Sequence, residues 1–191
     1  MKLSSKSASF IIKTTTLTAF ILAGMTGTAL ADELTVLPVA RDGYVANPTL
    51  SLKGGVNSMG IADEISPQLG VELAIDCPLL DVPVGQIRQQ VSYNYIRITD
   101  SARVHTVEAN PHWMYPLTEA FWLGGGPGFG YTNVKVLSFD AQHNLGLNLG
   151  ASAHLNLGKV FVGLESRYQW GFFGDLDADN FANTAKLGIS F

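Results

Sequence analysis

The sequence predicts an all-β protein: an eight-stranded antiparallel up-and-down transmembrane β-barrel with a packed polar interior. Three observations lead to this fold class. Segments that alternate apolar and polar residues recur from position 48 to the end, and a period of two is that of a β-strand. The apolar parity carries almost no charge at the strand centres, whereas the polar parity mixes charges with Gly, Ser, Asn and Gln. After the first 31 residues, no apolar run is long enough for a transmembrane helix.

Residues 1–31 are typical of a secretory signal peptide. Lys2, Lys6 and Lys13 precede a short apolar stretch, and "ALA" at 29–31 gives a small-x-small cleavage site. An uncleaved N-terminal anchor is the alternative. We expect a signal peptide over 1–31, an N-terminal extension over 32–47 without a clear strand pattern, and a β-barrel domain over 48–191.

Composition excludes several classes of function. The chain has 12 basic and 16 acidic residues, and cleavage before Asp32 would leave it more acidic. Phosphate backbones need a basic face, so nucleic acid is not an expected partner. The single cysteine, Cys77, allows no intramolecular disulfide and no paired thiol site.

The first four strands show the alternation with moderate regularity, and Gln89 breaks it. In the first, Leu50 and Leu52 face away from Ser51 and Lys53. These strands are expected within 48–56, 67–76, 85–96 and 103–115.

The last four strands include the clearest one. In "HNLGLNLGASAHLNLG" every odd position from Leu145 to Leu157 is Leu or Ala, and the even positions are polar or Gly. In the following strand the apolar face ends in Tyr168 and Trp170, as expected where a barrel wall meets the lipid headgroups. These strands are expected within 120–134, 143–158, 159–170 and 180–191.

The glycine run "GGGPGFG" lies on one of these strands. It lacks the Lys-Ser/Thr and the following helix of a phosphate-binding loop. Its glycines share the inward parity, which leaves room for bulky neighbours such as Trp122 in a narrow lumen. They are Gly124, Gly126, Gly128 and Gly130.

The polar faces carry charges of both signs. An eight-stranded barrel is just wide enough to be filled by side chains, and buried charges must be paired. We therefore predict a packed polar network in the lumen, although a catalytic or conducting role for some members stays open. Its members are Lys53, Glu72, Arg88, Glu108, His112, His154, Glu165, Arg167 and Lys186.

The connections between strands indicate short turns on one side and longer loops on the other, although "TDSA" is short for this rule. One connection carries Asp175, Asp177 and Asp179 at alternate positions. The Gly and the distal Glu of a calcium loop are missing, so a solvated outer loop is expected, with weak divalent-cation binding as the alternative. No metal site and no cofactor are expected.

The signal peptide, the eight strands, "GGGPGFGYT" and the terminal "KLGISF" together resemble the small outer-membrane β-barrel proteins of Gram-negative bacteria, of the OmpA/OmpX type or the opacity type. The resemblance implies an outer-membrane location, with outer-membrane lipid and lipopolysaccharide as partners. It also implies insertion by the assembly machinery, which recognises a final aromatic residue, here Phe191. The group includes adhesins, stability proteins, small channels and lipid-modifying enzymes.

The expected function is a structural or surface-interaction role without catalysis, and the oligomeric state stays open. A narrow channel for small solutes is the first alternative. A lipid A-modifying hydrolase is the second, because Ser152, His154 and Glu165 share one parity on neighbouring strands and can be drawn as a triad. That parity faces inward, away from a lipid substrate, and the His-x-Ser pair of such deacylases is missing.

Overall fold

The computed structural model describes residues 34–60, 65–99, 102–136, 141–173 and 179–191, and residues 35–191 form one compact unit. The predicted signal peptide lies outside the described residues. Within the described ranges, no helix is long and apolar enough to cross a membrane.

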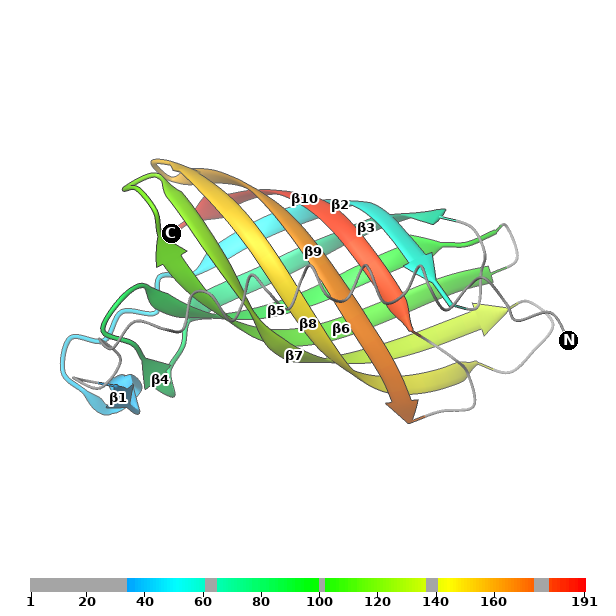
Figure 1. The fold of residues 1–191 in the computed structure, drawn as a ribbon, viewed down its shortest axis with the longest axis horizontal. Coiled ribbons are helices and arrows are strands. Elements are labelled where there is room, and N and C mark those ends of the chain that lie inside the picture. Colours follow the sequence, from blue (N-terminus) through cyan, green and yellow to red (C-terminus); the bar gives the residue numbers. More distant parts are fainter. Residues whose placement is uncertain (1–33, 61–64, 100–101, 137–140, 174–178) are drawn as a thin grey trace, which may run out of the picture. The chain divides into compact units, whose positions relative to one another are not determined.

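Eight long antiparallel strands close into a barrel, which confirms the predicted fold class (Figure 1). Each strand pairs with its neighbours in sequence, and β10 pairs with β2 in the register Lys186↔Lys53. Beyond this last pairing, the N–H of Phe191 donates to the carbonyl of Pro48 at 3.1 Å. The strands are β2 (Thr49–Met59), β3 (Ile65–Asp76), β5 (Gln86–Arg97), β6 (Ala102–Pro116), β7 (Phe121–Val136), β8 (Gln142–Leu157), β9 (Val160–Phe173) and β10 (Asn180–Ser190).

The barrel is apolar outside and polar inside. Leu52, Leu69 and Leu164 point outward and are each about two-thirds exposed, whereas Lys53 and Glu72 point inward and are buried. This arrangement is the reverse of a water-soluble barrel, and it is stable where lipid covers the outer wall. The alternation in the sequence therefore predicted correctly which face of each strand points outward.

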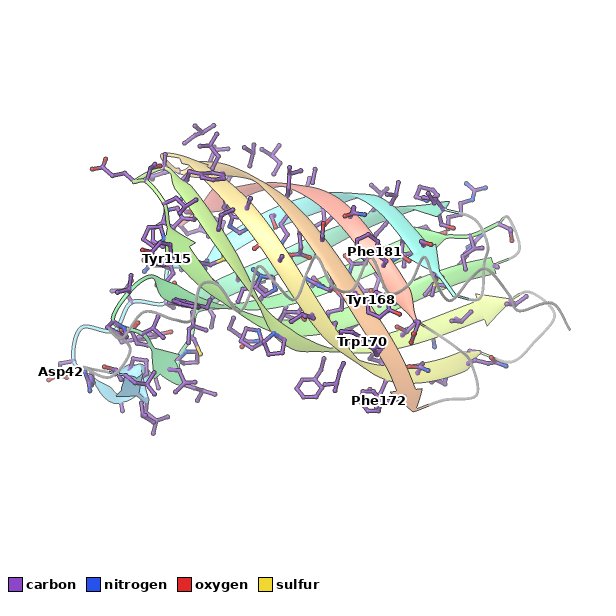
Figure 2. The ribbon with its side chains drawn as sticks, in the orientation of Figure 1. Asp42, Tyr115, Tyr168, Trp170, Phe172 and Phe181 are labelled. Carbon is purple, nitrogen blue, oxygen red and sulfur yellow. The ribbon has the colours of Figure 1, made fainter. Side chains whose placement is uncertain are left out.

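Aromatic side chains lie at both ends of the apolar belt (Figure 2). Tyr115 lies near the end at which β2 begins and β10 ends, which we call the proximal end. Trp170, Phe172 and Phe181 lie near the opposite, distal end, and the ring of Tyr168 packs edge-on against Trp170 at 4.7 Å. Aromatic belts of this kind mark the two membrane–water interfaces.

The interior is layered along the barrel axis. At the distal end, Met59, Ile96, Val104 and Val134 point inward and pack together as an apolar cap. Amide and hydroxyl side chains follow, and a layer of ionised groups lies below them. The prediction of a polar interior is thus confirmed for most of the lumen, and the apolar cap is a feature that it did not include.

The predicted difference in loop length between the two ends is wrong. The distal connections 60–64, 98–101, 137–141 and 174–179 are all short, and the longest connection, 77–85, lies at the proximal end. The reason is that strands β2, β7 and β9 extend past their predicted ends into residues that had been assigned to loops.

The segment predicted as a patternless extension contains two short elements. Strand β1 (Thr35–Val36) pairs with β4 (Leu80–Asp81), which belongs to the connection between β3 and β5. A turn of 3-10 helix, η1 (Pro38–Ala40), follows β1. Figure 1 shows β1 and β4 at the same end of the barrel as the C-terminus.

Candidate functional site

The centre of the lumen holds a compact group of ionised side chains from β2, β3, β9 and β10. The ammonium of Lys186 lies 2.7 Å from both carboxylate oxygens of Glu72 and also contacts Glu165. The ammonium of Lys53 lies 3.1 Å from Glu165 and 3.3 Å from Glu72. Each ammonium therefore lies between two carboxylates. These carboxylates offset the repulsion between Lys53 and Lys186, which are direct cross-strand neighbours.

Arg167 extends this group across the lumen to β6. Its guanidinium contacts Glu165 on its own strand and Glu108 on β6. Glu108 also accepts hydrogen bonds from Ser92 and Asn94, each at 3.0 Å. With Lys53, Lys186 and Arg167 facing Glu72, Glu108 and Glu165, the cluster is formally neutral. We call these six residues the charge layer.

Water has almost no access to the charge layer. The side chains of Lys186, Lys53 and Glu165 are 0%, 1% and 2% exposed. A charge buried to this degree is tolerated only when it is paired and hydrogen-bonded. The arrangement supplies those partners for every charge of the layer.

The two predicted histidines lie outside the charge layer's ion pairs. His112 is fully buried, and its Nδ1 lies 3.3 Å from the hydroxyl of Ser152. His154 stacks on Phe161, with ring centroids 5.3 Å apart.

The residues that could be drawn as a triad are not connected as one. Ser152 and Glu165 are register partners on β8 and β9, but within the described structure no hydrogen bond joins Ser152 to His154 or His154 to Glu165. Glu165 instead contacts three cations. All three side chains face the lumen, away from lipid.

Arg88 is separate from the charge layer and lies at the proximal end. Its guanidinium donates to Asp76 at 2.7 Å, to the carbonyl of Asn47 at 2.8 Å and to Thr49 at 2.9 Å. Asn47 in turn donates to the other carboxylate oxygen of Asp76 at 2.6 Å. Arg88 thus joins the segment before β2 to the last residues of β3 and the first residues of β5.

Inward glycines give the large polar side chains their space. A Cβ built on Gly150 would lie 2.9 Å from Nε2 of His112, and one on Gly163 would lie 2.8 Å from the ring of His154. On β7, Gly128 faces Asn110 and Asn148 in the same way, and Gly130 faces Gln169. The glycine run therefore makes space for inward side chains, but its glycines lie against Met114, Asn110, Asn148 and Gln169, and the predicted neighbour Trp122 is not among the nearest residues.

The outer wall carries a group of basic residues that sequence reasoning missed. Among the described residues of the barrel strands, the charged side chains that point outward are Arg97, Arg103 and Lys135. They are direct register neighbours, Arg97↔Arg103↔Lys135, across β5, β6 and β7 at the distal end, and all are exposed. The strand parity alone could have identified them, because each continues the apolar face of its strand.

A second row of polar groups lies one step below this basic row, toward the middle of the wall. His105, Asn133 and His143 are consecutive register partners on β6, β7 and β8. Tyr93 bonds Nδ1 of His105 at 2.6 Å, and the amide of Asn133 donates to Nδ1 of His143 at 3.0 Å. Nδ1 of His143 also contacts the hydroxyl of Tyr131. In the tautomer in which Nδ1 accepts these hydrogen bonds, Nε2 carries the proton and can donate to a ligand.

The predicted cation loop lies largely outside the described residues, which include only Asp179 of the three aspartates. One carboxylate oxygen of Asp179 accepts from the hydroxyl of Tyr168 at 2.9 Å, and the other accepts from the N–H of Gly171 at 2.9 Å. Asp179 therefore ties β9 to the start of β10. Among the described residues, no group of three or more His, Cys, Asp or Glu could hold a metal ion.

No family model matches the chain, and no curated protein matches it. Several solved structures share its fold at low identity. Neisserial surface protein A superposes with a TM-score of 0.62 at 10% identity, over 75% of this chain and 96% of that one. The attachment invasion locus protein Ail of Yersinia pestis gives 0.52 at 10% identity, over 76% and 97%. The outer membrane enzyme PagL gives 0.51 at 14% identity, over 74% and 99%.

These likenesses show the fold of small outer-membrane β-barrels. Two of the three proteins are named for the cell surface or for attachment, and the third is an enzyme. The same barrel therefore serves both catalytic and non-catalytic proteins, and the function of this chain has to be argued from its own residues.

Proposed function

We propose that this chain, an eight-stranded β-barrel of the Gram-negative outer membrane, has a structural and surface-interaction role and binds the phosphorylated headgroup of lipopolysaccharide. The observation that carries the proposal is the pair of Arg103 and Lys135 in the basic row, which are exposed and are direct register partners on β6 and β7. Like charges directly opposite each other destabilise a sheet. Two opposed cations, Arg103 and Lys135, on a wall that otherwise faces lipid would be stabilised by an anionic ligand that offsets their repulsion.

The position of the row fits the outer leaflet. A chain that inserts from the periplasm and crosses the membrane an even number of times keeps both of its termini on the periplasmic side. The proximal end, where β2 begins and β10 ends, then faces the periplasm, and the distal end faces outward. The row lies at this distal end, where the outward face passes from apolar residues to His105, His143 and then to cations. A phosphate at this depth would meet guanidinium and ammonium groups from above and an imidazole N–H from below.

Catalysis and conduction are not part of the proposal. In the described structure no hydrogen bond joins Ser152 to His154 or His154 to Glu165, and the three side chains face the lumen, away from lipid. The interior supports the barrel, and recognition takes place on its outer wall. The role of Phe191 as an assembly signal stays a prediction.

The experiment compares lipid A binding by paired variants of the detergent-folded barrel. Removing two charges of the row, as Arg103→Gln with Lys135→Gln, should reduce by at least half the rise in unfolding temperature that hexa-acylated lipid A produces. Each basic residue near an anionic lipid surface contributes about 1 kcal/mol, so about 2 kcal/mol of binding free energy should be lost. The measurement is thermal unfolding followed by circular dichroism.

The matched control removes two exposed cations of the proximal end, as Arg41→Gln with Lys159→Gln, and should retain the full rise. Lipid A without its phosphates should produce no charge-dependent rise in either protein. If lipid A still raises the unfolding temperature of the Arg103→Gln, Lys135→Gln variant by the full amount, these cations are neutralised within the protein and the proposal is wrong.

A further inference from the structure

A small lobe lies at the proximal end of the barrel, outside the wall. We define this proximal lobe as residues 35–47 and 77–85. The pairing of β1 with β4 holds its two segments together, and the N–H of Leu37 donates to the carbonyl of Leu79 at 2.8 Å. Since its two halves come from the segment before β2 and from the connection between β3 and β5, the lobe is fixed to three barrel strands.

One surface of the proximal lobe is apolar and exposed. Val36 is 62% exposed and Leu79 is 58% exposed, values within the range of the lipid-facing leucines Leu52 and Leu73 at 65% and 51%. Several exposed apolar side chains within so small a lobe are unusual in water and indicate an interaction site. The other exposed apolar residues of the lobe are Leu37, Val39, Val45, Leu80 and Val84.

The lobe joins the lipid-facing belt at its aromatic edge. The indole N–H of Trp113, which points outward from β6, donates to the carbonyl of Val84 at 3.0 Å. Gly85, in the left-handed region with φ 83°, brings the chain so close that a Cβ there would lie 3.1 Å from Nε1 of Trp113. The ring of Trp113 also packs edge-on against Tyr115. The apolar surface of the lobe thus continues the established lipid interface.

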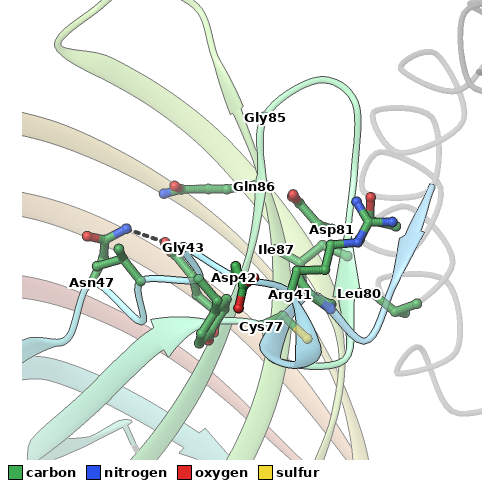
Figure 3. A pocket seen from close by; sticks show the side chains of 15 residues that line it. Arg41, Asp42, Gly43, Asn47, Cys77, Leu80, Asp81, Gly85, Gln86 and Ile87 are labelled. Atoms are coloured by element: carbon green, nitrogen blue, oxygen red, sulfur yellow. Dashed lines mark hydrogen bonds between the residues drawn. The ribbon is translucent and has the colours of Figure 1, made fainter. Parts of the chain in front are cut away.

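Figure 3 shows polar groups of the lobe together with Leu80 and Ile87. They line a cavity of about 440 Å³ between the lobe and the mouth of the barrel. Arg41, Asp42, Asn47 and Asp81 belong to this lining, together with Asp76 at the end of β3. Val45 and Leu80 line this cavity as well, whereas the exposed residues Val36, Leu37, Val39, Leu79 and Val84 do not. The apolar surface of the lobe consists of these last five residues, which lie outside the polar lining.

The geometry points to phospholipid as the occupant of the apolar surface: the proximal lobe inserts into the leaflet at the proximal end, at the boundary between headgroups and acyl chains. A lipid is favoured over a protein partner because the surface is continuous with the belt at Trp113 and Tyr115, the residue types that mark this boundary. The inference rests on the membrane location of the barrel and goes beyond the proposed function, because it concerns the opposite leaflet.

Spin-label accessibility can test this inference in the full chain. Nitroxide labels are attached in a Cys77→Ala background to Val36→Cys and Val39→Cys, and the proteins are reconstituted into vesicles of phosphatidylethanolamine and phosphatidylglycerol. Collision with oxygen reports lipid, and collision with a water-soluble nickel chelate reports water. Both lobe labels should collide with oxygen and be several-fold less accessible to nickel than a label at Asp42→Cys, on the polar side.

A label at Leu69→Cys, on the outer wall of β3, is the reference for lipid and shows separately whether the barrel has inserted. If Leu69→Cys reports lipid while the lobe labels are as accessible to nickel as Asp42→Cys, the lobe lies in water and the inference is wrong. If the lobe labels are shielded from both reagents, a second copy of the chain covers the surface, and this also overturns the inference.

Discussion

At the scale of single residues, Glu165 is the centre of the charge layer because it contacts Lys53, Lys186 and Arg167 together. Glu165→Gln would leave three buried cations facing two carboxylates. Removing one partner of a buried ion pair costs about 3–5 kcal/mol, since the remaining charge cannot return to water. We expect a loss of stability of this size in urea unfolding of the vesicle-bound barrel, followed by tryptophan fluorescence.

Two further variants show whether this loss comes from uncompensated charge. Glu119→Gln, in the exposed turn between β6 and β7, should change stability by less than about 0.5 kcal/mol. Adding Lys186→Met to Glu165→Gln restores neutrality, so the double variant should lose clearly less than the sum of the two single losses. Additive losses would contradict the charge argument.

At the scale of an element, β7 is fitted to β6 by its glycines. Pro111 and Pro127 lie opposite each other, where the pairing of the two strands is interrupted. The pairing stops at Ala109↔Phe129 and resumes at Trp113↔Gly125. A Cβ on Gly126 would meet the backbone carbonyl of Pro111, which cannot move aside as a side chain would. Gly126→Ala should therefore cost about 1–3 kcal/mol of unfolding free energy, the usual cost of overpacking.

Gly54→Ala is the matched control, because the same methyl group would point outward from β2. The nearest atom there is Cδ2 of Leu69 at 3.7 Å, an ordinary contact. Its stability should be unchanged or slightly higher, because alanine restricts the unfolded chain. Equal losses in the two variants would mean that strand propensity, and not the close approach to Pro111, explains the glycine.

The strands and their facing could be predicted because alternation is a local property of the sequence. The apolar cap was not predicted, because Met59, Ile96, Val104 and Val134 share the parity of the polar face and meet only after closure. The proximal lobe was missed because its strands are two residues long and pair across a wide gap in sequence. The partners within the charge layer also depend on the stagger between strands, which places Lys186 against Glu72, two strands away.

At the scale of the whole molecule, the contents of the lumen determine whether the barrel conducts. The side chains of the charge layer are each at most 7% exposed, and the apolar cap above it would have to admit water before an ion could pass. Passage would also separate paired charges in a space that water does not enter, at a cost of several kcal/mol per ion.

The purified barrel in a planar bilayer should therefore show no discrete conductance steps in 1 M KCl, while a general porin in the same membrane does. Heat-dependent migration on a detergent gel verifies that the inserted protein is folded, so that silence reflects a filled lumen and not a failed reconstitution. Reproducible steps from folded protein would contradict the closed lumen and favour the narrow channel.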